Sequence, residues 1–510
     1  MLKKIALLGL ASSLTLPALA EPTTQNTVAV RAAFEFSSID PSRAGFVFTR
    51  MQILETLVDV DEKGNLTPAL ATSWQISNAG TQWDFTLREG VKFHDGTELD
   101  ADVVAANLNL ALSKPGALQG VPVTAIEAIG KQQVRITLSQ PFQPLGAVLA
   151  HYSASIMAPA AFDEQNNVQA LIGTGPFSVY EIAAPHRLVV EKFDGYWGKK
   201  AQVEYANYLT GHRAEARVLQ ARSGQGDIVF GLDPAAVPML KRLPNLNVIH
   251  SDLPRTLALK LNLAHPNLDT IEERQALSLA MNRQGIATAV LRSADAATDQ
   301  LLPEYMGDWH VADGTPQLTP DLAKAAALMQ QAGWQKNADG WLEQNGEIFE
   351  LDLITYADRP ELTTVATAIQ DQWKQLGVKL NVNVTNSSAI PAGHQDGSLE
   401  VALIARNYGS IADPLGVLVK DFGSEKGGDW GSMNWNNPSI QTTLNNLVAE
   451  TDQERYHQQA QQVAKAIYTE MPMIAVASYV QQTAVNKRVD GFRFDPYERS
   501  YFLNELVWTK

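Results

Sequence analysis

Alternating polar and apolar positions predict a β-strand at residues 82–87. The segment reads QWDFTL, in which every second side chain is apolar, as in a strand with one buried face. Turn signals at residues 88–90 and 94–96 enclose a second short strand at 91–93. Asp100 then occupies the N-cap position of a helix over residues 101–113, whose apolar positions fall on one face.

The second half of the chain alternates between helices and strands. Asp321 and Gly333 bracket one amphipathic helix, and Gly377 ends another. The predicted elements are helices at 272–291, 322–332, 361–376 and 452–469, the last broken by Pro472, and a strand at 378–384. Helices that alternate with strands predict an α/β fold. No internal repeat, low-complexity segment or long flexible linker interrupts the pattern.

The first twenty residues have the pattern of a secretory signal peptide. Lys3 and Lys4 precede a 12-residue apolar run, and Ala18-Leu19-Ala20 is a small-x-small cleavage site. The run is shorter than the roughly 20 residues that a transmembrane helix needs. We therefore expect cleavage after Ala20 and export to the periplasm as a soluble protein. Because the chain has no cysteine to lipidate, we do not expect a lipoprotein.

Composition narrows the class of protein further. A chain of 510 residues implies two to four domains at about 100–200 residues per domain. Its formal charge of -15 repels phosphate backbones, so nucleic acid is not an expected partner. The absence of cysteine excludes disulfides, thiolate zinc sites and thiol nucleophiles.

Motifs for catalysis and for metal binding are mostly missing. The nine histidines are scattered, and the closest two, His250 and His265, are 15 positions apart, which excludes a local zinc pair. No G-x-S-x-G nucleophile elbow is present. The loop that begins at Asp59 resembles a calcium loop, but Leu70 stands where glutamate is required. We therefore expect neither an enzyme nor a resident cofactor.

An ordered series of motifs resembles one family of transport proteins. The longest runs from Leu66 to Trp74 and, after eight residues, from Trp83 to Thr97. It is followed by GTGPF at 173–177, YWG at 196–198, RSGQGDI at 222–228, RQAL at 274–277, KAAALMQQAGW at 324–334 and QWKQLGV at 372–378. Together they resemble the solute-binding proteins of the dipeptide, oligopeptide and nickel type (family 5), over essentially all of residues 25–510.

The resemblance implies an architecture and a role. Such proteins have two α/β lobes joined by hinge strands, with an extra subdomain in the first lobe, and enclose their ligand between the lobes. By analogy the first lobe comprises residues 21–50, 172–250 and 472–510, the subdomain 51–171, and the second lobe 251–471. The implied partners are a small-molecule ligand and an inner-membrane ABC permease with its ATPase, and we expect a monomer. A ligand-sensing protein with the same fold is an alternative role.

The segment from Ala402 to Pro414 bears on the ligand. In the peptide binders, a similar stretch before Asp-Pro supplies an aspartate that pairs with the α-ammonium of the peptide. The corresponding position here is Ser410, which cannot supply that charge-assisted contact, so ordinary free-amine dipeptides are expected to bind poorly. Asp413 resembles the structural aspartate of the Asp-Pro turn.

The same segment also fits a pattern of the nickel binders, Arg-x-aromatic-Gly-x-x-x-Asp-Pro. The fit runs from Arg406 without a gap, but the histidine that precedes this arginine in some nickel binders is Ala405 here. The cleft arginine of their first lobe falls at Tyr152. Either the neighbouring His151 serves as a metal ligand, or the metal arrives already chelated, or the ligand is another small acid.

These comparisons give the candidate site. We expect Arg406, at the end of a buried strand, to hold a ligand carboxylate bidentately, so that Arg406→Ala abolishes binding. The other candidates are Asn407, Tyr408, Ser410, Tyr152, Trp430 and Trp435, with His151 as a metal ligand. The predicted cargo is a small polar molecule with a carboxylate, most of all a nickel or other metal chelate, and alternatively a short or modified peptide.

Overall fold

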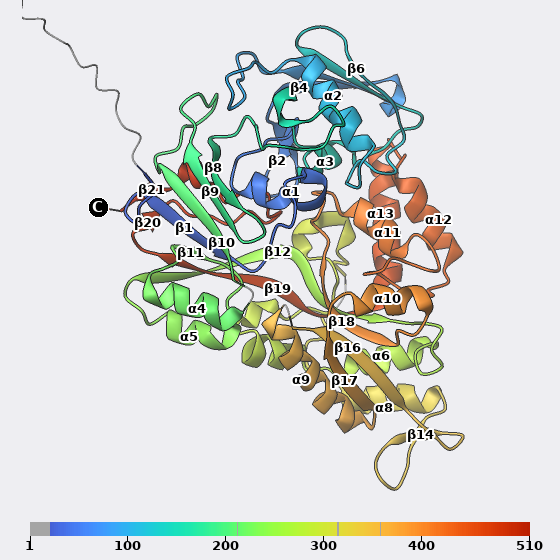
Figure 1. Ribbon diagram of the computed structural model, residues 1–510. Helices are drawn as coiled ribbons and strands as arrows, with labels where there is room; N and C mark the ends of the chain where they lie inside the picture. The colour runs from blue at the N-terminus through green and yellow to red at the C-terminus, as the bar shows by residue number, and fades with distance from the viewer. Residues whose placement is uncertain (1–20, 212, 314–315, 358, 510) are drawn as a thin grey trace, which may run out of the picture.

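The fold is built around one long mixed sheet (Figure 1). The computed structural model describes residues 21–211, 213–313, 316–357 and 359–509. Ten strands follow the order β17-β16-β18-β12-β19-β11-β1-β10-β9-β8. Their bounds are β1 (Thr27–Ala32), β8 (Phe177–Ala183), β9 (Arg187–Lys192), β10 (Tyr205–Thr210), β11 (Ile228–Val229), β12 (Leu246–Leu261), β16 (Glu350–Tyr356), β17 (Lys379–Thr385), β18 (Val401–Asn407) and β19 (Met473–Asn486). The α/β class expected from the sequence is confirmed.

Two long strands in the middle of this sheet connect its halves. β12 and β19 pair antiparallel from Leu246 opposite Asn486 to Lys260 opposite Met473, with irregular register between Asp252 and Ala258. At one end they contact β11, and at the other β12 contacts β18. These strands therefore join the two lobes, as hinge strands do in this architecture.

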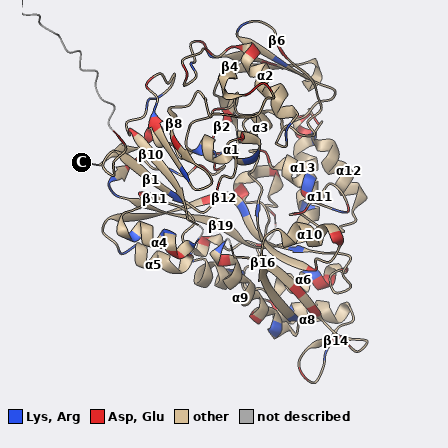
Figure 2. Cartoon of the chain, viewed as in Figure 1, with Lys and Arg blue, Asp and Glu red and all other residues tan. Residues whose placement is uncertain are grey.

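Apolar side chains gather into three main clusters along the chain. One contains buried residues between positions 28 and 54, 157 and 230, and 489 and 506, and we call this part the first lobe. A second spans positions 57–158, and we call it the subdomain. The third spans positions 257–477 and forms the second lobe. Figure 2 shows Lys and Arg mixed with Asp and Glu over the helices and strands of these parts. The domain boundaries given above remain predictions.

The subdomain is a four-stranded antiparallel sheet with a helix packed on it. Its strands follow the order β4-β5-β7-β6, and β5 covers the six predicted residues, 82–87. Asp100 caps α2 as predicted, because its side chain accepts the N–H of Val103. The expected strand at 91–93 is reduced to a single antiparallel β-bridge between Lys92 and Glu98. The elements are α1 (Pro41–Arg50), which belongs to the first lobe, and β2 (Val58–Val60), β3 (Leu66–Pro68), β4 (Ala71–Ser77), β5 (Gln82–Leu87), α2 (Ala101–Leu112), β6 (Val123–Ala128), β7 (Gln133–Leu138) and α3 (Leu145–Leu149).

Helices cover the sheet of the second lobe. They are α6 (Ile271–Leu279), α8 (Leu322–Gln331), α9 (Pro360–Leu376), α10 (Ala389–Asp396), α11 (Pro414–Phe422), α12 (Pro438–Leu447) and α13 (Gln453–Glu470). The predicted cap Asp321 accepts a backbone N–H, and Gly377 ends α9 with φ 103°. Asp452, predicted as the first residue of a helix, is the N-cap of α13 and accepts the N–H of Arg455. In the first lobe, α4 (Ala214–Ser223) and α5 (Val237–Leu240) flank the sheet, and the chain ends in β20 (Val489–Asp490) and β21 (Val507–Trp508).

The single helix predicted at 272–291 is wrong. α6 ends at Leu279, and Asn282 caps a new short helix, α7 (Arg283–Gly285), by accepting the N–H of Gly285. A π-helical turn over residues 286–290 follows. Arg283 is fully buried and donates to the carbonyl of Ala475 and to Ser278, so tertiary contacts fix the break.

No helix among the described residues is long and apolar enough to cross a membrane. The predicted signal peptide, Met1 to Ala20, lies outside the described residues.

Candidate ligand-binding site

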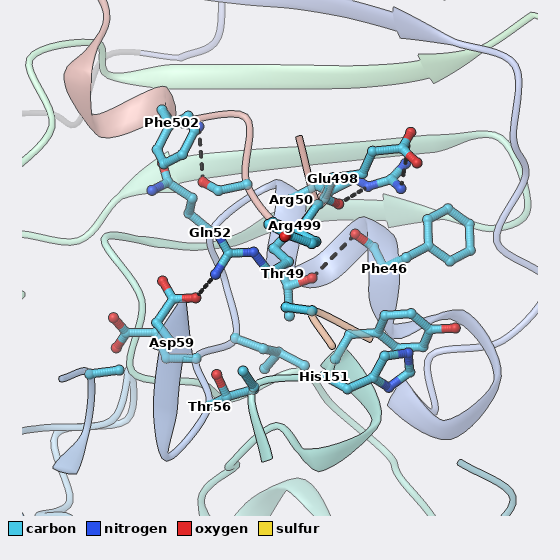
Figure 3. Close-up of a pocket in the computed structure, with 18 of the residues that line it drawn as sticks. Phe46, Thr49, Arg50, Gln52, Thr56, Asp59, His151, Glu498, Arg499 and Phe502 are labelled. Carbon is cyan, nitrogen blue, oxygen red and sulfur yellow. Dashed lines mark hydrogen bonds and ion pairs between the residues drawn. The ribbon is translucent and has the colours of Figure 1, made fainter. Parts of the chain in front are cut away.

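A cavity of about 500 Å³ lies where the first lobe, the subdomain and the second lobe meet (Figure 3). Its walls come from α1 and the segment that follows it to Asp59, from residues 147–152 of the subdomain, from Arg255 of β12, from residues 407–412 after β18, and from residues 497–505 near the C-terminus. Cavities of this size enclose most of a small organic ligand. The cavity is therefore the candidate site.

Four of the predicted site residues line this cavity: Tyr152, His151, Asn407 and Ser410. Tyr152 stacks against His151 at 3.8 Å between ring centroids and meets Phe46 edge to face at 6.2 Å. Asn407 turns the chain after β18, because its side-chain oxygen accepts the N–H of Gly409 at 2.9 Å. Tyr152 and His151 belong to the subdomain, and Asn407 and Ser410 to the second lobe, so both parts contribute to the cavity wall.

His151 is a neutral imidazole in this position. Its Nδ1 accepts the backbone N–H of Ser153 at 3.2 Å and lies 2.9 Å from the hydroxyl of Ser153. Burial lowers the pKa of His151 to about 4, so the ring is uncharged at neutral pH. Among the described residues, no group of three or more His, Asp or Glu side chains is placed to hold a metal ion.

Arg406 does not line the cavity. β18 continues through Asn407, and Arg406 pairs with Thr256 of β12, so its side chain leaves from within the sheet and not from its end. Its guanidinium forms a bidentate ion pair with Asp421 of α11, Nε to Oδ2 at 2.6 Å and Nη2 to Oδ1 at 2.8 Å. The Asp421 side chain is 1% exposed. This placement corrects the expectation that Arg406 emerges at the end of the strand, while its contact with a ligand stays a prediction.

Three aromatic candidates also lie outside the cavity lining. Tyr408 is fully buried in the second lobe, and its hydroxyl has no partner among the described residues. Trp435 is 2% exposed and donates its indole N–H to Glu470 at 2.8 Å. Trp430 packs edge to face on Tyr356 at 6.1 Å. Around the two tryptophans, residues 428–432 lie against Lys420 and Asp421 of α11, and Trp435 meets Phe422 of the same helix edge to face.

The charged groups of the cavity come from segments that the sequence did not single out. Glu498 accepts Arg255 Nη2 at 2.5 Å, and Arg50 Nη2 lies 3.7 Å from the same carboxylate. Although burial opposes it, Arg255 and Arg50 lower the pKa of Glu498 to about 2. Arg499 donates to Asp59. Arg50 and Glu498 are separated by 448 positions, so no local pattern could have paired them.

A side chamber of about 50 Å³ adjoins the cavity and shares Phe34, Arg50, Arg255, Glu498 and Ser500 with it. Tyr479 of β19 holds two guanidinium groups against its ring, those of Arg255 at 5.0 Å and Arg359 at 4.8 Å.

Polar groups without partners face this chamber. Arg359 makes no hydrogen bond or ion pair with any described residue, and Arg255 Nε and Glu361 Oε1 are buried without a hydrogen-bond partner in the described chain. Although burial lowers it, nearby Tyr479 and Glu361 raise the pKa of Arg359 above its ordinary value, so its charge is secure. Buried polar groups are normally paired, so these donors and this acceptor are available to a ligand.

Two of the sequence motifs meet at one carboxylate on the cavity wall, that of Glu55. Glu55 accepts the hydroxyl of Thr174 at 2.7 Å, that of Tyr196 at 2.9 Å and the indole N–H of Trp197 at 3.0 Å. Burial raises the pKa of Glu55 to about 7, although these hydrogen bonds act in the opposite direction. The GTGPF and YWG motifs thus position the wall of the site.

Comparison with known proteins identifies the family. A sequence model of the bacterial extracellular solute-binding proteins, family 5 Middle, matches residues 65–429. The dipeptide-binding protein and the nickel-binding periplasmic protein of Escherichia coli strain K12 are each 24% identical, with 86% of both chains covered. The crystal structure of NikA from Brucella suis in complex with Fe(III)-EDTA superposes with a TM-score of 0.86 at 21% identity, covering 94% of this chain and 100% of that one.

The match covers more than half of the chain and agrees with the two-lobed fold described above. Proteins of this family are the binding components of ABC importers and not enzymes. This chain belongs to the bacterial extracellular solute-binding proteins of family 5.

Proposed function

We propose that this protein captures a small polar solute with a carboxylate between its lobes and delivers it to an inner-membrane ABC permease with its ATPase. The observation that supports this cargo is the pair Arg255 and Arg359, which face the chamber beside the cavity with guanidinium donors that no described residue accepts. A planar guanidinium matches a carboxylate in geometry and in charge. Both arginines are held by Tyr479, so they are preorganised for this role.

Within this class, we retain a nickel or other metal chelate as the first candidate cargo. Chelators of transition metals carry carboxylates, which suit Arg255 and Arg359, and the coordinated metal needs no protein ligand. His151 could add one ligand through Nε2 only if Nδ1 took the proton, which would exchange the backbone N–H of Ser153 that Nδ1 accepts for a bond donated to the hydroxyl of Ser153. A short or modified peptide presents the same carboxylate and is the alternative cargo.

We also propose that the protein acts as a monomer in the periplasm after cleavage behind Ala20. The signal pattern and the periplasmic relatives support this location.

The test is native mass spectrometry with elemental analysis of protein purified from the periplasm without added metal. Tight ligands survive purification when a closed site slows their release. The proposal predicts a bound mass that contains a carboxylate, and nickel, cobalt or zinc in that mass would identify a chelate. A metal-free mass of a few amino acids would identify a peptide. A bound molecule with no acid group would contradict the proposed class of cargo.

A further inference from the structure

The side chamber contains an acceptor as well as donors. Glu361 lies in the first turn of α9 and lines the chamber together with Arg255 and Arg359. Its residue is 7% exposed, and its Oε1 has no hydrogen-bond partner in the described chain. Arg255, at 6% exposure, retains Nε without a partner in the same chamber. Two nearly buried residues of opposite charge therefore line one small space, and each has a buried polar atom that no described residue pairs with.

An unpaired carboxylate oxygen in such a place needs a donor. Burial raises the pKa of Glu361, whereas Arg359, the backbone N–H of Glu361 itself and Arg255 lower it. Oε1 has no hydrogen-bond partner in the described chain. Arg359 contributes charge nearby without forming an ion pair with Glu361, because its guanidinium lies against Tyr479 and Phe34. Leaving a buried acceptor unpaired is unfavourable, so a ligand cation is the natural partner for this oxygen.

We propose that Glu361 receives the free ammonium of an α-amino acid headgroup whose carboxylate lies on Arg359 and Arg255. The inference rests on the proposed function and narrows its cargo to solutes in which one carbon carries both groups. The chamber, about 50 Å³, has room for such a headgroup and not for a whole solute. The remainder of the ligand extends past Arg50 and Phe34, which the chamber shares with the cavity of about 500 Å³.

In this placement Glu361 is the anionic partner of the ligand ammonium. The position that supplies this charge in peptide binders is the neutral Ser410 in this chain. Ser410 lines the main cavity and not the side chamber, so the amine lies on a different wall from that position. An ordinary peptide carries its ammonium and its carboxylate at opposite ends. It fits this chamber less well than a γ-glutamyl compound or a free amino acid, in which the two groups share a carbon.

The experiment uses two matched pairs of probes in calorimetry with the mature protein. Glutathione is compared with glutaryl-cysteinylglycine, and L-histidine with imidazolepropionic acid; each second compound lacks only the α-ammonium. Because the chain has no cysteine, the thiol cannot form a mixed disulfide with it. Fe(III)-EDTA serves as an acid without a free ammonium.

We expect at least one zwitterionic probe to bind, and its partner without the ammonium to bind about 10- to 100-fold more weakly, as for the loss of one charge-assisted contact. Glu361→Gln should lower the affinity for the zwitterionic probe by a similar factor and leave the affinity for the matched compound without the ammonium unchanged. Glu361→Asp should recover part of the lost affinity. Glu350→Gln is the matched control, since Glu350 is an exposed residue of β16 paired with Lys379. Circular dichroism checks that each variant is folded.

Equal affinity for the two members of each pair would overturn the role of Glu361. If the protein bound Fe(III)-EDTA but neither zwitterionic probe, the role of Glu361 would also be overturned, whereas the proposed function would stand. If none of the acids bound, including Fe(III)-EDTA, both proposals would fail.

Discussion

At the scale of single residues, the ion pair between Arg406 and Asp421 stabilises the second lobe. Asp421 is almost fully buried, and Arg406 supplies both hydrogen bonds to its carboxylate. Burial raises the pKa of Asp421, while Arg406 and then Lys260 lower it. The carboxylate depends on these cations to stay charged inside the lobe.

We predict that Arg406→Ala lowers the free energy of unfolding by about 3–5 kcal/mol, because it leaves a buried carboxylate without its partner. Denaturant titration measures this change. Arg187→Ala is the matched control, since Arg187 and Glu181 form an exposed pair, both 42% exposed, whose loss should change stability by less than about 1 kcal/mol. Wild-type stability together with loss of ligand binding would return Arg406 to the binding site.

At the scale of elements, Glu55 joins three segments that are distant in sequence. The segments are the stretch after α1, the GTGPF loop and the turn at Tyr196 and Trp197. The loop can approach because Gly173 and Gly175 have no side chain: a Cβ atom on either would lie 2.1 Å from a carbonyl oxygen of the stretch after α1. Gly173, Gly175 and Glu55 therefore form one junction, at which the three segments meet.

This junction is expected to respond to pH. The pKa of Glu55 is raised in the folded state to about 7, from an ordinary value of 4.5, so the folded protein retains a proton that the unfolded chain loses. The associated stability is present below about pH 4.5 and is lost as the pH rises through 7. Glu55→Gln removes this dependence, so between pH 4.5 and 8 the variant should gain up to about 3 kcal/mol relative to wild type.

The measurement is urea denaturation of both proteins across this pH range. Glu89→Gln, at an exposed turn of the subdomain, controls for the loss of one negative charge. A constant difference between wild type and Glu55→Gln at all pH values would show that Glu55 is ionised throughout.

At the scale of the whole molecule, Arg359 contacts both lobes. It begins α9 in the second lobe, lies over Tyr479 of the connecting strand β19, and approaches Phe34 of the first lobe at 6.0 Å. A ligand carboxylate bound to the guanidinium of Arg359 would be linked to both lobes, because Arg359 contacts both. Closure around a ligand requires contacts of this kind, which favour the closed arrangement.

Arg359→Gln should therefore lower the affinity for the carboxylate-bearing ligand identified by native mass spectrometry by about 10- to 100-fold, which is the effect of losing one charge-assisted hydrogen bond. The fold should be preserved, because no described residue relies on Arg359 for a hydrogen bond or ion pair. Calorimetry measures the affinity, with Arg187→Gln as a control for the loss of a positive charge. Unchanged affinity would exclude Arg359 from the site.

Local patterns in the sequence were sufficient for much of the fold. β5, α2, α8, α9 and α13 lie where periodicity and capping residues predicted them, because those signals act within a few residues of the chain. The ordered motifs were sufficient for the family, since they are long and occur along most of the chain.

The candidate binding site could be identified only from the tertiary structure. Arg50, Arg255, Glu498 and the pair Arg359 and Glu361 come from four separate segments, and only the folded chain shows which of their donors and acceptors have no partner among the described residues. The same holds for Arg406, which a motif placed at the ligand and which the fold pairs with Asp421. A sequence records residue types and local spacing, whereas the availability of a charge for a ligand depends on the neighbours that folding places around it.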